Sequence, residues 1–199
     1  MKGVLDAERE TYLADDSDGP ASAPDLTDNE GSLLALVLRR QPVTAYQILK
    51  IYEQSPVSSF NESKGSLYPL IRRMKERGLL AARRVSGDGR NAELLHCTET
   101  GREAVRNWVL HVRPSHILPD DPLRTKIISF DLLDPAQQRE WIERVRAIVA
   151  RKMEEVDAYW IGLDIPFQQL VHANAMDALR GRLEWLDRIA ETLADKDQT

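Results

Sequence analysis

Residues 63–80 read Ser-Lys-Gly-Ser-Leu-Tyr-Pro-Leu-Ile-Arg-Arg-Met-Lys-Glu-Arg-Gly-Leu-Leu, and their spacing predicts an amphipathic helix. Apolar residues recur three and four positions apart: Leu67, Leu70, Ile71 and Met74. A different side of the same helix carries small, aromatic and basic residues: Gly65, Tyr68, Arg72 and Lys75. Gly78 follows the last apolar position, where glycine usually supplies a left-handed helix end.

Two extended runs follow this helix. They cover Leu79–Val85 and Asn91–Cys97, and the glycine- and aspartate-containing turn 86–89 between them predicts a β-hairpin. A helix with a basic outer face followed by a hairpin is the outline of a winged helix-turn-helix. The helix would enter the DNA major groove, and the hairpin would lie against the backbone or the minor groove.

The charge is distributed unevenly along the 199 residues, whose net charge is −5. Residues 1–28 hold two basic and eight acidic side chains, residues 29–113 fourteen and eight, and residues 114–199 eleven and sixteen. We therefore divide the chain into an acidic, mostly disordered tail (1–28), a positive DNA-binding domain (29–113) and a helical dimerisation domain (114–199). The fold class expected is mainly α with a small β-hairpin wing.

The composition favours a cytoplasmic protein. The longest apolar run, Leu33–Leu38, is too short to span a bilayer, and the acidic amino terminus does not resemble a signal peptide. One cysteine, Cys97, excludes an intrachain disulfide and suits a reducing compartment. Cys97 is either a thiol sensor or, more commonly for such a residue, a small packed side chain.

Four segments together resemble the PadR family of bacterial transcriptional regulators. They are Leu34-Ala-Leu-Val-Leu, Thr44-Ala-Tyr-Gln-Ile-Leu, the run Lys64–Leu80 with its Gly-Ser-Leu-Tyr-Pro core, and Thr98-Glu-Thr-Gly-Arg. The resemblance covers about residues 31–113 closely. It implies a homodimeric winged-helix repressor with a helical carboxy-terminal dimerisation domain. The chain departs from the family pattern at Ala45, where glycine is usual, and at residues 94–97, where Leu-Leu-His-Cys replaces Tyr-Tyr-x-Leu.

Helices are expected in the carboxy-terminal domain over residues 121–133, 135–160 and 167–194. The last one carries an apolar seam that steps by three and four: Met176, Leu179, Leu183, Leu186, Ala190 and Leu193. Such a seam requires a partner helix. An antiparallel pairing with 135–160 is expected, and a second copy of the chain would cover the remaining apolar surface. We assign homodimerisation to Met176, Leu179, Leu183, Leu186 and Leu193.

The residues expected at DNA are Lys64, Gly65, Ser66, Tyr68, Arg72, Arg73, Lys75, Arg90 and Asn91. Gly65 and Ser66 would let the helix approach the duplex closely, and Arg72 would reach a base edge. Lys64, Arg73 and Lys75 would meet phosphates, and Arg90 and Asn91 the backbone or minor groove. The alternatives are a solvated surface charge for each basic residue and partial burial for Tyr68.

Four tryptophans suggest either core packing, the commoner case, or the walls of an aromatic pocket for a hydrophobic effector. They are Trp108, Trp141, Trp160 and Trp185. The sequence shows no constellation for catalysis, a metal or a cofactor, so an enzyme is not expected. The expected function is repression of transcription by a homodimer on a roughly palindromic operator. The alternative is a dimeric protein-interaction module that no longer reads DNA.

Overall fold

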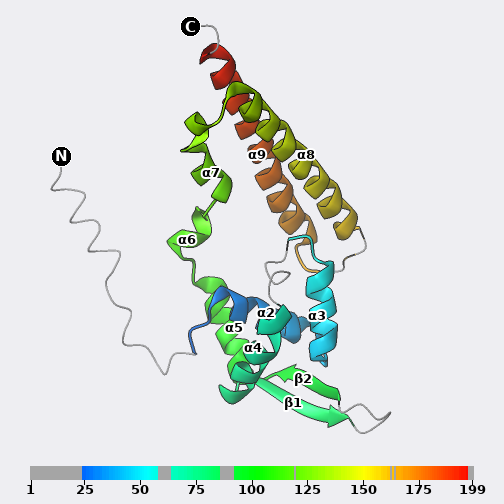
Figure 1. Ribbon diagram of the computed structural model, residues 1–199. Coiled ribbons are helices and arrows are strands. Elements are labelled where there is room, and N and C mark those ends of the chain that lie inside the picture. The colour runs from blue at the N-terminus through cyan, green and yellow to red at the C-terminus, as the bar shows by residue number, and fades with distance from the viewer. Residues whose placement is uncertain are drawn as a thin grey trace, which may run out of the picture.

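The computed structural model describes residues 24–57, 64–85, 92–118, 120–161, 163 and 165–196. The amino-terminal part folds as α2 (Asp28–Arg40), α3 (Ala45–Gln54), α4 (Lys64–Glu76), β1 (Leu80–Val85), β2 (Ala92–Cys97) and α5 (Glu99–Leu110). The carboxy-terminal part comprises α6 (Pro114–Ile117), α7 (Pro122–Ile127), the 3₁₀ turn η2 (Phe130–Leu132), α8 (Pro135–Trp160) and α9 (Gln168–Lys196). Figure 1 shows the long α8–α9 pair projecting from the amino-terminal part. Helices α6 and α7 lie to the left of this pair in the view. This mainly helical architecture with a hairpin confirms the expected fold class.

The first two helices begin at capping boxes. Thr27 caps α2 together with Glu30, and Thr44 caps α3 together with Gln47, as the spacing of the second pair predicts. Because Thr27 is the cap, α2 starts at Asp28. Leu26 is 1 % exposed, so the end of the segment assigned to the tail packs on the winged-helix core.

Helix α4 carries the predicted apolar face. Leu67, Leu70, Ile71 and Met74 are all buried. The helix begins at Lys64, so Pro69 is its sixth residue and lies beyond the first turn. Gly78 ends it with a φ of +70°, and the Leu79 N–H donates to the Met74 carbonyl at 2.9 Å. This is the left-handed glycine stop that the sequence indicates.

The hairpin places β1 antiparallel to β2, with Leu80 opposite Cys97 and Val85 opposite Ala92. The turn and its residues Arg90 and Asn91 lie outside the described residues. Val43 forms an isolated bridge with Leu95, and the Leu95 N–H donates to the Val43 carbonyl at 2.8 Å. The segment expected only to break the helices therefore also joins α3 to the wing.

The stretch expected as one helix over 121–133 is shorter in the structure. Helix α7 ends at Ile127, and the chain then forms the η2 turn. Phe130 packs edge-on against Trp141, with ring centroids 5.0 Å apart, and Gln138 donates to the Phe130 carbonyl at 2.8 Å. Burying Phe130 thus interrupts the helical phase that Leu123 and Ile127 begin.

Helices α8 and α9 form the expected antiparallel pair (Figure 1). This pairing already uses the seam assigned to dimerisation. Met176 and Leu186 are 5 % and 0 % exposed, and Leu179, Leu183 and Leu193 are partly buried in the same clusters. The seam is therefore mainly an intramolecular contact with α8, because one helix of comparable length covers it.

Large apolar side chains remain exposed elsewhere in the described part of the carboxy-terminal half: Ile117, Leu118, Ile128, Leu132, Ile148, Ile161, Phe167, Leu170 and Val171. Within the described residues, no helix combines the length and hydropathy needed to cross a membrane.

Candidate nucleic-acid interface and junction pocket

The outer face of α4 presents a tyrosine and an arginine to solvent. Tyr68 is 55 % exposed, so it is not packed against a neighbouring helix. The Arg72 side chain is 75 % exposed and makes only a long contact of 3.7 Å with Glu76 on the same helix. Gly65 and Ser66 are exposed at the start of the helix, and a Cβ added to Gly65 would meet nothing within 4 Å.

The next two basic residues of α4 are held by carboxylates. Arg73 lies 3.7 Å from Glu30 of α2, and the Lys75 ammonium donates to Glu93 of β2 at 2.7 Å. Neither residue is the free surface cation that the sequence suggests. The side chain of Lys64, together with Arg90 and Asn91, lies outside what the structure describes.

A groove of about 750 Å³ runs between α4, the start of α3 and β2. Tyr68, Arg72 and Lys75 line it from α4, and Tyr46 and Glu93 line it from the other two elements. Tyr46 is 62 % exposed there. The periodicity of α3 alone did not identify it as a surface residue, because its exposure depends on where α4 and β2 lie.

Strand β1 adds two exposed arginines, Arg83 and Arg84, beside this groove. They stand on neighbouring positions and so point to opposite faces of the hairpin. Sequence reasoning did not select them, although two consecutive arginines in an expected wing strand are a usable signal. Arg84, which stands opposite Glu93 of the groove, adds a positive charge on the same side as Arg72, and Arg83 adds one on the other face of the hairpin.

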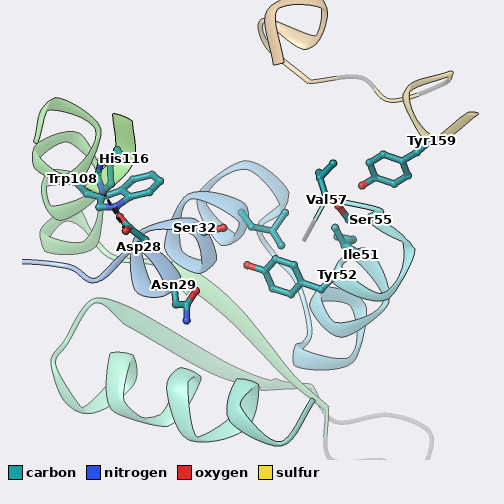
Figure 2. Close-up of a pocket in the computed structure, with 11 residues that line it drawn as sticks. Asp28, Asn29, Ser32, Ile51, Tyr52, Ser55, Val57, Trp108, His116 and Tyr159 are labelled. Atoms are coloured by element: carbon teal, nitrogen blue, oxygen red, sulfur yellow. Dashed lines mark hydrogen bonds and ion pairs between the residues drawn. The ribbon is translucent and has the colours of Figure 1, made fainter. Parts of the chain in front are cut away.

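A second cavity of about 600 Å³ lies where the two halves of the chain meet. Figure 2 shows residues from α2, α3, α5, α6 and the end of α8 around it. The aromatic part of the lining comprises Tyr52, Trp108 and Tyr159. Burial raises the pKa of Tyr52 to about 12, so its hydroxyl is neutral at physiological pH.

One wall of this junction pocket is fixed by Asp28. Its carboxylate accepts from the Trp108 indole N–H at 3.1 Å and lies 3.2 Å from His116 Nε2. The Trp108 hydrogen bond is the largest influence on Asp28, and with His116 and Arg113 it holds the pKa of this carboxyl below its ordinary value against the opposing effect of burial. The Asp28 carboxylate is therefore ionised at neutral pH.

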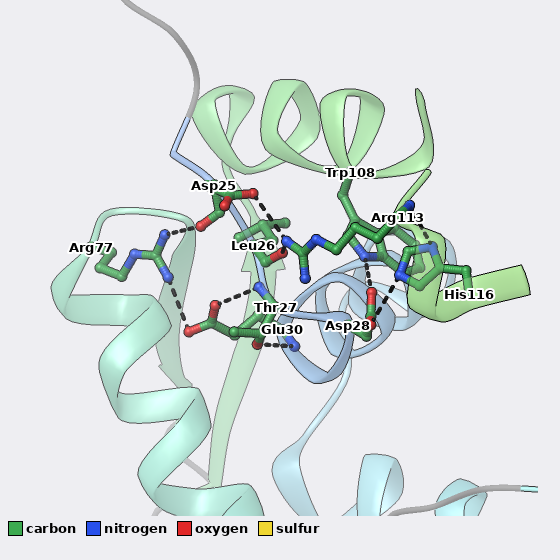
Figure 3. Close-up of polar contacts among 9 residues, drawn as sticks. All are labelled: Asp25, Leu26, Thr27, Asp28, Glu30, Arg77, Trp108, Arg113 and His116. Atoms are coloured by element: carbon green, nitrogen blue, oxygen red, sulfur yellow. Dashed lines mark hydrogen bonds and ion pairs between the residues drawn. The ribbon is translucent and has the colours of Figure 1, made fainter. Parts of the chain in front are cut away.

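The residues preceding α2 connect two distant parts of the domain (Figure 3). Arg77, just after α4, donates to the Asp25 carbonyl at 2.9 Å and to Glu30 at 3.0 Å. Arg113, just before α6, donates to the Leu26 carbonyl at 3.1 Å. Segment 25–30 thus contacts both the end of α4 and the start of the carboxy-terminal half.

The structure does not bring the four tryptophans together. Trp108 alone lines the junction pocket. Trp141 and Trp185 belong to the cluster around Phe130 and Leu186, and Trp160 belongs to a separate cluster with Val156 and Met176. Trp141 and Trp160 have the core role that the sequence left open, whereas Trp185 packs in its cluster and also lines a cavity of about 740 Å³ beside Ile128 and Phe130.

The comparisons with known proteins agree with this geometry. Residues 33–107 match the model of the transcriptional regulator PadR-like family. The fold is similar to *Bacillus subtilis* PadR in complex with operator DNA, with a TM-score of 0.68 and 16 % identity over 84 % of this chain and 99 % of that one. *B. subtilis* PadR in complex with p-coumaric acid gives a TM-score of 0.65 and 14 % identity over 83 % and 98 % of the chains.

The PadR-like transcriptional regulator BC1756 from *Bacillus cereus* gives a TM-score of 0.61 and 19 % identity over 87 % of this chain and 99 % of that one. At these identities the structural matches establish the fold. No curated protein sequence matches the chain significantly.

Proposed function

We propose that this chain, whose residues 33–107 match the model of the PadR-like family of transcriptional regulators, represses transcription by binding operator DNA as a homodimer. The observation that carries the proposal is the exposed Tyr68–Arg72 face of α4 beside the basic strand β1. An exposed helix face of this kind fits the major groove, while a neighbouring β-hairpin reaches the backbone or the minor groove.

The roles proposed for α4 follow from exposure. Arg72 extends freely from the helix, so it is the residue that reads a base edge, where a bidentate contact contributes about 1–3 kcal/mol of discrimination. Gly65 and Ser66 allow close approach at the start of the helix. Lys64 contacts a phosphate, and Arg73, which is 57 % exposed, leaves its 3.7 Å contact with Glu30 to do the same. Such contacts fix orientation without reading sequence. The wing residues Arg90 and Asn91 complete the contact with the backbone or the minor groove.

We propose that the exposed apolar residues of the carboxy-terminal half form the dimer contact. Ile128 and Leu132 are each 80 % exposed, and Phe167 and Leu170 at the start of α9 are 76 % and 69 % exposed. Large apolar patches on soluble proteins mark interaction surfaces. A second copy would place a second α4 on the next half-site, about 34–36 Å away in winged-helix and related dimers.

The junction pocket is the site we propose for an effector. It touches α2 and α3 of the winged-helix part as well as α6 and α8, so an occupant would contact both halves at once. The described lining contains one carboxylate, Asp28, which lies 3.2 Å from His116, and neither lysine nor arginine. A neutral or cationic aromatic molecule therefore fits it better than a carboxylic acid, since like charges in one site repel.

The DNA-binding proposal is tested by selecting duplexes from a randomised pool with the wild-type chain and with Arg72→Ala. We expect wild type to enrich a two-fold symmetric site, and Arg72→Ala to lose preference at one position in each half-site. Arg180→Ala is the matched control, because Arg180 is an exposed arginine paired with Asp177 on α9. Absence of binding by wild type would favour the protein-interaction alternative, and unchanged preference in Arg72→Ala would remove its base-reading role.

The effector proposal is tested by titrating p-coumaric acid and its methyl ester while tryptophan fluorescence is recorded. We expect the ester to bind more tightly than the acid, and Asp28→Asn to narrow the difference. Trp108→Phe should abolish the fluorescence change without abolishing ester binding by calorimetry. Equal affinities for acid and ester in wild type would contradict the role assigned to the Asp28 charge.

A further inference from the structure

A single ion pair joins α4 to the root of the wing. The Lys75 ammonium and the Glu93 carboxylate are 2.7 Å apart, although the residues are 18 positions apart in the chain. Their side chains are 33 % and 40 % exposed, so the pair lies at the surface with one side against the protein. The hydrogen bond from Lys75, with help from its charge and from Arg84, holds the pKa of Glu93 below its ordinary value. Glu93 is thus a carboxylate with cations on two sides.

The position of Glu93 is unexpected for a DNA-facing surface. It lines the same groove as Tyr68, Arg72 and Lys75, and it stands opposite Arg84 in the β1–β2 ladder. A phosphate that approached Lys75 through this groove would meet a negative charge. It would also compete with an existing hydrogen bond of 2.7 Å for the ammonium.

We propose that Glu93 is a specificity-determining residue, which acts by withholding Lys75 from the phosphate backbone. The inference rests on the proposed DNA binding through α4. Glu93 positions Lys75 and touches no base itself. It lowers the affinity for any duplex, whatever its sequence, and leaves the base contact of Arg72 intact.

The physical reason is that nonspecific binding is almost entirely electrostatic. Each phosphate neutralised by a lysine or arginine releases counterions and adds about 0.9 to the slope of log K against log salt. Glu93 pairs with Lys75 and stands opposite a second cation, Arg84. It therefore removes part of the electrostatic free energy of nonspecific binding. Base contacts depend little on salt, so their share of the total free energy of binding rises.

The inference is tested with Glu93→Gln, which keeps the side-chain size and removes the charge. The probe is a random-sequence 30-base-pair duplex, and binding is followed by fluorescence anisotropy between 50 and 300 mM KCl. We expect the slope to steepen by about 0.9 and the affinity at 50 mM salt to rise about tenfold, as for one additional phosphate contact. The ratio of operator to random-duplex affinity should fall, with the operator taken from the selection described above.

Two further variants identify the cause. In Glu93→Gln/Lys75→Gln the additional slope should disappear, because the freed ammonium is absent. Glu140→Gln removes a carboxylate with the same kind of partner, Arg144 at 2.5 Å on α8, and should leave the slope unchanged. It therefore controls for net charge.

An unchanged slope in Glu93→Gln would overturn the inference while leaving DNA binding in place. So would a slope that stays steep in the double variant, because the effect would then be long-range charge and not release of Lys75. Failure of the wild-type chain to bind the duplex at 50 mM salt would overturn the proposed function as well, which distinguishes the two results.

Discussion

Replacing Glu30 by glutamine should destabilise the winged-helix part by about 2 kcal/mol at pH 7. Glu30 is 6 % exposed, accepts from the Thr27 N–H at 3.1 Å, and pairs with Arg77 at 3.0 Å. Losing a partner from a fully buried ion pair costs about 3–5 kcal/mol, and a hydrogen bond to a charged group contributes about 1.5–3 kcal/mol. Arg77 is 33 % exposed and keeps its hydrogen bond to the Asp25 carbonyl in the variant. The loss of stability should therefore fall in the smaller of these two ranges.

The destabilisation caused by Glu30→Gln should be larger at neutral pH than at acidic pH. Burial opposes the charge of Glu30, but the Thr27 N–H and Arg77 outweigh it and hold the pKa of Glu30 below its ordinary value of 4.5. A carboxyl whose folded pKa is depressed stabilises the fold above its ordinary pKa, and this contribution is lost as the pH falls through the folded value. The difference between wild type and Glu30→Gln should therefore be largest at pH 7 and shrink below about pH 4.5.

The assay is urea unfolding followed by circular dichroism at pH 7 and at pH 3.5, with Arg77→Met and the double variant completing a thermodynamic cycle. Glu140→Gln serves as the control, because the exposed pair with Arg144 should contribute less than about 1 kcal/mol. A loss below about 0.5 kcal/mol in Glu30→Gln, or a loss equal at both pH values, would refute the reasoning.

Three further outcomes are expected. Gly78→Ala should lower the free energy of unfolding by about 1 kcal/mol, measured by urea unfolding. The φ of Gly78 is +70° and an added Cβ meets nothing within 4 Å, so only the backbone penalty remains. A more stable variant would contradict this. Leu186→Ala should destabilise the α8–α9 pair by about 2–5 kcal/mol, since Leu186 is 0 % exposed, and a thermal melt of the full chain checks it. Burial raises the pKa of the Cys97 thiol, so iodoacetamide at pH 7.5 should alkylate the folded chain more slowly than the urea-unfolded chain, and equal rates would exclude protection by the fold.

The local features of α4 are predictable because they depend on neighbours in the sequence. The burial of Leu67 and Met74 follows from a period of 3.6 residues, and the helix end at Gly78 follows from the backbone freedom of one residue. The same holds for the capping box of Thr44, whose partner is three residues away.

The charge partners within the site are not predictable in this way. Lys75 meets Glu93 across 18 residues, and Glu30 meets Arg77 across 47. Periodicity assigns each of these residues to a face but gives no information about which residue of another element lies opposite. A basic face read from sequence therefore overstates the number of free cations, since Arg73, Lys75 and Arg77 each lie within ion-pair distance of a carboxylate on another element.

The carboxy-terminal half shows a related ambiguity. The seam on α9 correctly predicted that a helix covers Leu186, but a helix of the same chain and a helix of a second copy satisfy the same pattern. Helix α7 was predicted too long because Phe130 fits a helical spacing, yet its contact with Trp141 turns it into the core. In both cases the deciding interaction is tertiary.

The six residues 25–30 have a mechanical consequence. The guanidinium of Arg77 donates to the Asp25 carbonyl, and that of Arg113 donates to the Leu26 carbonyl from the opposite side. A displacement of α6 would therefore act directly on the carboxy-terminal end of α4, the helix proposed to contact DNA, with no need to deform the hydrophobic interior between them (Figure 3). Asp25 and Leu26, which the sequence places in the disordered tail, therefore form a direct connection between the two halves.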